Sequence, residues 1–359
     1  MKGRADAMWP LLWRSVAAIV LLTVAAPADA AVQIELQTAS GGVIISGAYP
    51  NYSAGFGAIN GLGVGSPAAG VTILSGGVTG GVLYTTPYNM FISGIKNADN
   101  GVTAYASSNF SHPAILVLNS CPYNATCTSA ANFSALSTNA AAPTTIIARP
   151  GVADKTTSRA TLAIFVANTN GSGAFTGSDN ATITFVAKNY QNNQTDTITL
   201  TLNNQTVQTA VRLTLATASG GSTIAAGSDY AIDYSNVNGL GIGPATGLTT
   251  LSVSGGSIYA TPYLLAPAFS SFSSTTGTLK AYVSTDFAHP SILELRDSSS
   301  SGGTYGAISK SSGAPTTLSS ATSGTNVTRY LGLFVSNANG SGTFTGADVS
   351  TLTYTLIVP

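Results

Sequence analysis

Apolar and polar residues alternate in short runs along this chain. Val32, Ile34 and Leu36 are separated by polar residues, and residues 162–166 form a denser apolar run of the kind that lies between two layers. The same period of two recurs over residues 182–185, 197–202, 211–215 and 351–356. Gly-Gly, Asn-Gly and Ser-Gly pairs separate the runs at intervals of roughly ten residues, which is typical of antiparallel sandwiches. The pattern therefore predicts an all-β fold.

The landmarks of the first part of the chain return in the same order in the second. Residues 32–42 recur as 211–221, and residues 60–65 recur as 238–243. Further matched pairs are 84–88 with 259–263, 110–113 with 287–290, and 168–173 with 337–342. The sequence therefore predicts two tandem homologous antiparallel β-sandwich domains, Ig-like or jelly-roll-like, over residues 31–188 and 211–359.

Residues 189–210 are predicted to be a connecting strand or linker. They contain an alternating run at residues 197–202 that has no counterpart elsewhere in the chain. If this strand closes the first domain, the second lacks its equivalent because the chain stops at Pro359; if it opens the second, the first lacks it. One domain is then a strand short, and the exposed edge could pair with another chain. The alternative is that the strand is an extra edge and both domains are complete.

The N-terminal region has the features of a secretory signal peptide. Lys2, Arg4 and Arg14 accompany an apolar run over residues 16–26, and Ala28-Asp29-Ala30 offers a small-residue cleavage site. We therefore expect residues 1–30 to be removed and the mature protein to be secreted, periplasmic or held at the cell surface. No later run is long enough for a membrane span, and no lipid or sorting anchor is expected.

Charge and composition exclude some classes of function. Of the 13 basic and 13 acidic residues, 10 and 11 remain after residue 30, so the mature chain lacks the basic footprint of a nucleic-acid-binding protein. Low charge combined with many Val, Ile, Leu, Tyr and Phe residues favours a folded core over disorder.

Candidate catalytic groups are sparse. His112 and His289 occupy the same place in the two repeats, each before a proline, but no set of metal ligands or triad partners accompanies them. The serine-hydrolase motif Gly-x-Ser-x-Gly is absent, and Asp179 and Asp348 are the acidic residues that match between the repeats. We therefore expect a protein that is not an enzyme, with structural histidines.

Two segments have the ligand spacing of a twelve-residue calcium loop. The candidate ligands are Asn168, Asn170 and Asp179 in the first repeat, and Asn337, Asn339 and Asp348 in the second. The ligands are mostly neutral, however, and strands rather than helices flank them. The alternative is that Asn and Gly here form turns between strands, and no cofactor is expected.

Tyr84 and Tyr88, and in the second repeat Tyr259 and Tyr263, bracket a Thr-Pro pair in a Tyr-x-Thr-Pro-Tyr motif. Exposed tyrosines could stack on sugars, so a pair of carbohydrate-binding modules is the alternative function. The same tyrosines would serve equally well as packing residues in a sandwich.

Cys121 and Cys127 are the two cysteines of the chain, and in an exported protein they predict a disulfide. The bond would close a short loop in the first repeat only.

The ending Gly342-Thr-Phe-Thr-Gly-Ala-Asp348, followed by an alternating strand, resembles the ends of secreted fimbrial or coat-type β-sandwich subunits. The likeness covers less than a tenth of the chain. With the features above, it favours an exported structural or adhesive protein of the cell surface. Its expected partners are copies of itself or other surface proteins, which strand exchange would link into a filament or coat. Glycans are the alternative partners.

Overall fold

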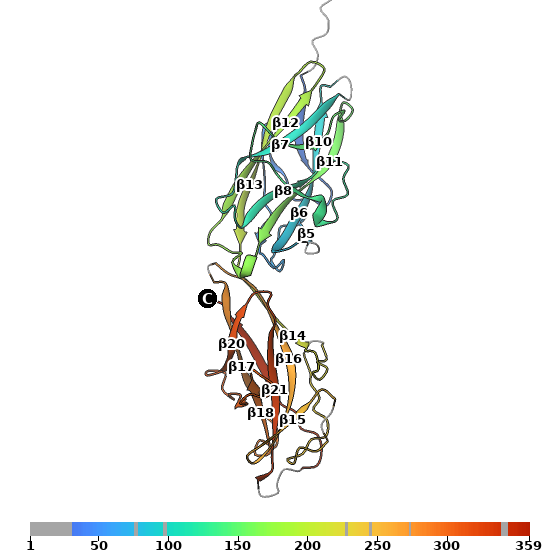
Figure 1. Cartoon of the computed structure of the whole chain (residues 1–359). Coiled ribbons are helices and arrows are strands. Elements are labelled where there is room, and N and C mark those ends of the chain that lie inside the picture. The colour runs from blue at the N-terminus through green and yellow to red at the C-terminus, as the bar shows by residue number, and fades with distance from the viewer. Residues whose placement is uncertain are drawn as a thin grey trace, which may run out of the picture.

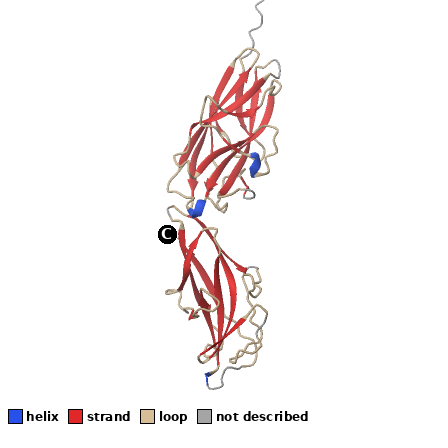
Figure 2. Ribbon diagram, in the orientation of Figure 1, coloured by secondary structure: helices blue, strands red, loops and turns tan. Residues whose placement is uncertain are grey.

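The computed structural model describes residues 31–74, 78–95, 99–226, 229–243, 246–272, 274–338 and 344–359; the expected signal peptide lies outside them. Two β-rich bodies lie end to end, the first containing strands up to β13 and the second beginning with β14 (Figure 1). We refer to residues 31–207 as the first half and to residues 210–359 as the second half. Strands dominate both halves, as Figure 2 shows, which confirms the predicted all-β class.

The first half consists of two facing sheets. One sheet has the strand order β1-β6-β11-β8-β9, with β5 also paired to β6. Its strands are β1 (Gln33–Thr38), β5 (Thr72–Leu74), β6 (Gly81–Ser93), β8 (Leu116–Cys121), β9 (Ser134–Ala135) and β11 (Thr156–Ala167). The other has the order β10-β7-β12-β13-β3-β2, with β4 also paired to β13. Its strands are β2 (Ser46–Ala48), β3 (Asn51–Ala54), β4 (Ala58–Ile59), β7 (Asn100–Ser108), β10 (Thr144–Ile147), β12 (Asp179–Asn189) and β13 (Thr195–Val207). Two short 3-10 helices, η1 (Ala130–Asn132) and η2 (Thr169–Gly171), lie in the connections.

The second half repeats the first sheet but only part of the second. Its larger sheet has the order β14-β16-β21-β18-β19, with β15 paired to β16, and its smaller sheet has the order β20-β17-β22. The larger sheet consists of β14 (Ala210–Thr217), β15 (Thr249–Val253), β16 (Gly256–Ser270), β18 (Leu293–Ser298), β19 (Gly306–Ala307) and β21 (Val327–Ser336). The smaller consists of β17 (Thr276–Thr285), β20 (Thr316–Thr322) and β22 (Thr351–Ile357).

Strand β13 contains the alternating run of residues 197–202, which has no counterpart in the other repeat and which the sequence could not assign to either domain. It pairs antiparallel with β12 and parallel with β3, so it lies inside a sheet of the first half and is not a free linker. Ile198, Leu200 and Leu202 are buried, while the threonines between them face outward. The alternative in which this strand closes the first domain is therefore the one that the structure adopts.

The two halves join through a short, packed connection. Only Gln208 and Thr209 separate β13 from β14. The Ser271 N–H donates a hydrogen bond to the Gly171 carbonyl of η2 at 2.5 Å. Gly171 has a φ of +87°, and a Cβ at this position would collide with the Phe269 ring of the second half. Glycine is therefore needed here both for its backbone conformation and for the close approach of the two halves.

Candidate functional site: an unpaired strand edge

Strand β22 is the feature that most clearly distinguishes the two halves. It corresponds to β12, because Phe185 pairs with Ala104 of β7 and Tyr354 pairs with Ala281 of β17, the matching position. β12 has a partner on each side, β7 and β13. Within the described part of the chain, β22 pairs with β17 alone. The backbone donors and acceptors along its other edge therefore have no strand partner.

The side chains of β22 also lack the cover that β13 gives β12. Ala181, Ile183, Phe185 and Ala187 of β12 are buried, as is every second residue of that strand. The corresponding residues of β22 that point toward the core, Leu352, Tyr354 and Leu356, are only partly buried. Three incompletely buried core residues along a strand with one unpaired edge are what the absence of a neighbouring strand would produce.

Among its described residues, the second half also lacks counterparts of β3 and β4, the strands that pair with β13 on the side away from β12. Strands β3 and β4 flank β13 in the first half. Tyr52 and Ala54 of β3, Phe56 of the connection and Ile59 of β4 are buried. The counterpart segment, residues 229–237, forms no strand and has Tyr230, Ile232, Tyr234 and Val237 at these positions. Tyr230 is exposed, and the other three are only partly buried. β14 lies near β22 at this edge without forming a ladder. In the first half the corresponding strand β1 lies near β13.

A histidine–aspartate clamp fixes the base of β12 and of β22. Oδ2 of Asp179 accepts hydrogen bonds from Nδ1 of His112 at 2.8 Å and from the His112 backbone N–H at 2.9 Å. Its Oδ1 accepts from the backbone N–H groups of Ser111 and Asn180. The His112 ring stacks on Phe175, with ring centroids 4.0 Å apart. Because an ionised carboxylate only accepts, Nδ1 of His112 carries the proton.

The second half repeats the clamp atom for atom. Asp348 accepts from Nδ1 of His289 at 2.9 Å and from the backbone N–H groups of Ala288, His289 and Val349. The His289 ring stacks on Phe344 at 4.2 Å. The two histidines are therefore structural, as their shared place in the repeat predicted. The clamp holds the loop before β18 against the residues that lead into β22.

Burial and hydrogen bonding shift the pKa values of both aspartates in opposite directions. Burial opposes ionisation of Asp179, but the N–H groups of Ser111, His112 and Asn180 and the His112 ring outweigh it and hold the pKa of Asp179 below 3.8. The pKa of Asp348 is lowered in the same way: burial opposes ionisation, and the Ala288, His289 and Val349 N–H groups together with the His289 ring outweigh it.

The Asp179→Asn variant is expected to destabilise the first half by about 2–3 kcal/mol, because an amide nitrogen cannot accept the hydrogen bonds that the carboxylate accepts. A lowered pKa means that the wild type has this stability above pH 3.8 and loses it as the pH falls through the pKa of the folded state. The variant should therefore lose less stability than the wild type between pH 4 and pH 2, as measured by urea unfolding across that range. Equal acid sensitivity of the two proteins would contradict this account of the clamp.

These hydrogen bonds correct the calcium-loop expectation for its acidic positions. Four donors occupy the two carboxylate oxygens of Asp179, and four occupy those of Asp348, so neither keeps a free lone pair for an ion. The Asn168 and Asn337 backbone N–H groups donate to the Gly80 and Gly255 carbonyls, the same turn contact in both halves. Asn170 lies in η2, and Asn339 is outside the described residues. Among the residues that the structure describes, no three His, Cys, Asp or Glu side chains gather as a metal site would require.

The four tyrosines proposed to stack on glycans lie in the core instead. Tyr84, Tyr88, Tyr259 and Tyr263 are at most 2% exposed, so none presents a ring face to a sugar, and the glycan-stacking interpretation of these residues is wrong. Tyr84 and Tyr259 anchor loops: their hydroxyls accept from the Asn60 and Asn238 N–H groups and donate to the carbonyls of the same residues. The period of two in β6 and β16 places both tyrosines of each motif on the inner face of its sheet.

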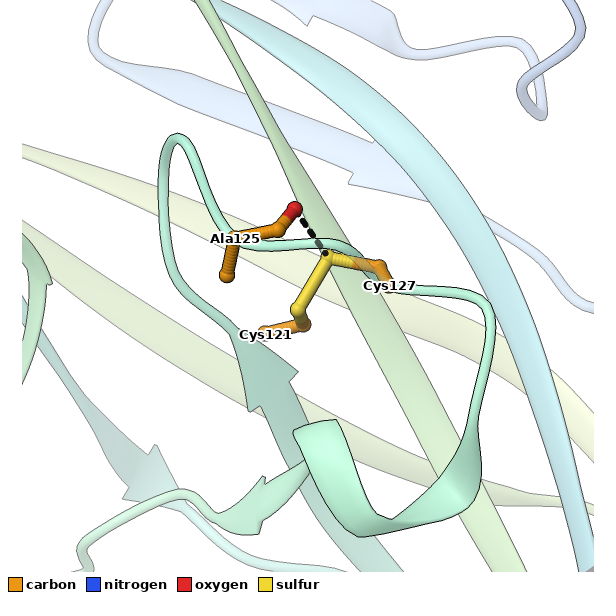
Figure 3. The surroundings of a disulfide bond; sticks show 3 residues. All are labelled: Cys121, Ala125 and Cys127. Carbon is orange, nitrogen blue, oxygen red and sulfur yellow. Dashed lines mark hydrogen bonds between the residues drawn. A yellow bond between two sulfur atoms is a disulfide. The ribbon is translucent and has the colours of Figure 1, made fainter.

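Cys121 and Cys127 form the predicted disulfide at the end of β8. Figure 3 shows the bond closing a small loop, with Sγ of Cys127 lying 3.4 Å from the Ala125 carbonyl oxygen. The second half has no such bond, so the disulfide restrains one loop and is not required by the fold.

A buried charged cluster in the second half was not predicted from the sequence. Arg329 of β21 forms an ion pair with Asp297 of β18, and the Tyr263 hydroxyl donates to Oδ1 of Asp297 at 3.2 Å. The Tyr263 and Tyr354 rings lie 5.7 Å apart. The paired registers give Ala160 and Ser120 as the counterparts of Arg329 and Asp297. Comparing the repeats position by position would have revealed this replacement of small residues by charges.

Comparison with known proteins gives low-similarity structural neighbours only. No protein-family profile matches the chain, and no curated protein matches it. The CooA pilin subunit of enterotoxigenic Escherichia coli is 14% identical, with a TM-score of 0.26, and the match covers 49% of this chain and 98% of the pilin. The CupB6 tip adhesin of Pseudomonas aeruginosa is 9% identical, with a TM-score of 0.29, over 91% of this chain and 95% of the adhesin. A chain of a chaperone–tip adhesin complex of CFA/I fimbriae biogenesis is 11% identical, with a TM-score of 0.21, over 92% of this chain and 84% of that one.

None of the helices in the described ranges is long and apolar enough to cross a membrane.

Proposed function

We propose that this protein is an exported, non-enzymatic structural or adhesive component of the cell surface, and that its second half joins an assembly by accepting a β-strand from another chain along β22. The observation that carries the proposal is the contrast between β12 and β22. Among the residues that the structure describes, β12 has two partners in the first half and its counterpart β22 has one in the second.

The chemistry of the edge suits a strand as its ligand. Unpaired backbone groups along the seven residues of β22 can form a ladder with an extended peptide of almost any sequence. Leu352, Tyr354 and Leu356 then supply apolar contacts on the face toward the core. A small molecule could satisfy neither the ladder nor a row of alternating contacts, so strand addition is the mode of binding that fits.

The first half supports the same mode, because it contains the strand that the second half lacks. β13 lies antiparallel to β12 and buries Ile198, Leu200 and Leu202 against the core. A strand entering beside β22 would occupy the corresponding position. β13 itself already has a partner on each side, so it is not free to pair with β22. The proposed source of the strand is therefore another chain.

Binding of synthetic strands to the mature protein, residues 31–359, tests the proposal. One peptide has the sequence of residues 195–207, a second is its Leu202→Ala form, and a control peptide carries Asn at positions 198 and 200. We expect at least one of the first two to slow hydrogen exchange of the β22 amides and to raise the unfolding temperature of the second half, while the control does neither. If neither peptide protects β22 at millimolar concentration, the second half is not a strand acceptor.

A further inference from the structure

We propose that the strand accepted by the second half carries, at the position where β13 has Leu202, a side chain smaller than leucine. This inference rests on the strand-accepting function proposed above and specifies the partner's sequence. It follows from the register of β13 between its two neighbours, transferred to the second half.

On the side of β22 the register is fixed by the matched ladders. Leu202 lies opposite Ala181, Leu200 opposite Ile183, and Ile198 opposite Phe185. The counterparts of the three β12 residues are Ser350, Leu352 and Tyr354, because β12 and β22 pair with β7 and β17 in the same register and with the bulge at the same place. The residue that replaces Leu202 therefore lies beside Ser350.

On the other side, β13 runs parallel to β3, with Leu202 beside Ala54 and Leu200 beside Tyr52. Two observations fix the matching residues in the second half. The bridge between Ala225 and Ala231 repeats the pairing of Ser46 with Ser53, and Ser235 has the positive φ of its counterpart Gly57. Ile232 is then the counterpart of Ala54, and Tyr230 is the counterpart of Tyr52.

The space available to the incoming strand is conserved at the Leu200 position. Leu200 lies between Tyr52 and Ile183, and the second half offers Tyr230 and Leu352 there, which conserves volume.

At the Leu202 position the first half supplies two alanines, Ala54 and Ala181, both buried. The second half supplies Ile232 and Ser350. Side chains that lie opposite each other on adjacent strands share a face and are in contact, so the isoleucine takes the space that leucine fills in the first half. A leucine there would overpack the site, whereas alanine fits.

The size selection is tested by measuring how tightly the peptide of residues 195–207 and its Leu202→Ala form bind the mature protein. Fluorescence anisotropy with labelled peptides should show that the Leu202→Ala form of residues 195–207 binds about tenfold more tightly than the natural sequence, because relief of one overpacked contact is worth about one factor of ten. In the Ile232→Ala protein the preference should reverse, because leucine then refills the space that isoleucine occupied. An Ile232→Val protein, with one methylene less, should show an intermediate ratio and guards against a folding defect in the alanine variant.

The outcomes separate the two proposals. Equal affinity of both peptides for the wild-type protein, or a preference for alanine that persists unchanged in the Ile232→Ala protein, would overturn the size selection and leave strand acceptance standing. Absence of binding by either peptide to all three proteins would overturn strand acceptance and the size selection with it. Folding of each variant is checked by circular dichroism before titration.

Discussion

Replacing Leu200 with aspartate is expected to unfold the first half while leaving the second half folded. Leu200 is 2% exposed and lies between Ile183 and Tyr52 in the middle of a sheet. The variant loses the burial of a leucine and forces a carboxylate among apolar side chains, so we expect a loss of at least about 5 kcal/mol, comparable to the whole stability of a small domain. Hydrogen exchange measured by mass spectrometry, which reports the two halves separately, should show rapid exchange in β12 and slow exchange in β16.

The control for this prediction is Thr197→Asp, which places the same charge on the exposed face of the same strand. It should change stability by less than about 0.5 kcal/mol. Similar exchange in the two variants would contradict the role of β13 as a core strand. The same reasoning applies to a deletion of residues 197–202. Because it removes three buried side chains from the first half, it tests folding and cannot by itself test assembly.

Replacing Arg329 with alanine is expected to destabilise the second half by about 3–5 kcal/mol. The substitution leaves the buried Asp297 carboxylate without its cation, and the Tyr263 hydroxyl alone cannot compensate for the lost charge. Urea unfolding at neutral pH measures the loss. The double variant Asp297→Ser with Arg329→Ala installs the residues found at the matching positions of the first half, Ser120 and Ala160, and should recover most of the stability.

The pH dependence gives this prediction a second measurement. Burial raises the pKa of Asp297, and the Arg329 guanidinium opposes the rise. Without the guanidinium the pKa rises further. A carboxyl group whose pKa is higher in the folded state than in the unfolded state favours folding below the pKa of the unfolded state, and that contribution is lost as the pH rises through the folded value. The deficit of the Arg329→Ala protein should therefore shrink between pH 7 and pH 4. A double variant as unstable as Arg329→Ala, or a deficit independent of pH, would contradict the ion-pair account.

The repeat explains why much of the fold could be predicted. A period of two in short runs, interrupted by glycine pairs, leaves few alternatives to antiparallel strands, and matched landmarks locate the same core residues twice. The structural role of the two histidines could be predicted for the same reason. A residue that recurs with its neighbours in both repeats is expected to stabilise each repeat and not to form an active site found in one of them. The disulfide followed from the presence of two cysteines in a chain expected to be exported.

The candidate site was harder to predict because it is the edge of β22 that lacks the strand partner found in the first repeat. The run at residues 197–202 showed that a strand was unmatched, but alternation alone cannot say which sheet a strand joins. The sheet that β13 joins depends on its hydrogen bonds to β12 and β3. β12 directly precedes β13 in the chain and runs antiparallel to it, whereas β3 lies far earlier and runs parallel to it. The tyrosines failed for a related reason: an aromatic pair around Thr-Pro looks the same in sequence whether its rings face solvent or the core.

The strand pattern, the duplication and the matched places of the two histidines could be predicted from the sequence, because each depends on local period or on comparison of one copy with the other. The disulfide could be predicted because the chain has two cysteines and is expected to be exported. Only the folded structure shows that β13 lies inside a sheet of the first half, that β22 has one strand partner among the described residues, that Asp179 and Asp348 accept hydrogen bonds from the two histidines, and that Asp297 meets Arg329 inside the core. Each of these depends on contacts between residues distant in the chain, and such contacts follow from how strands pair and sheets face each other, which local alternation does not specify.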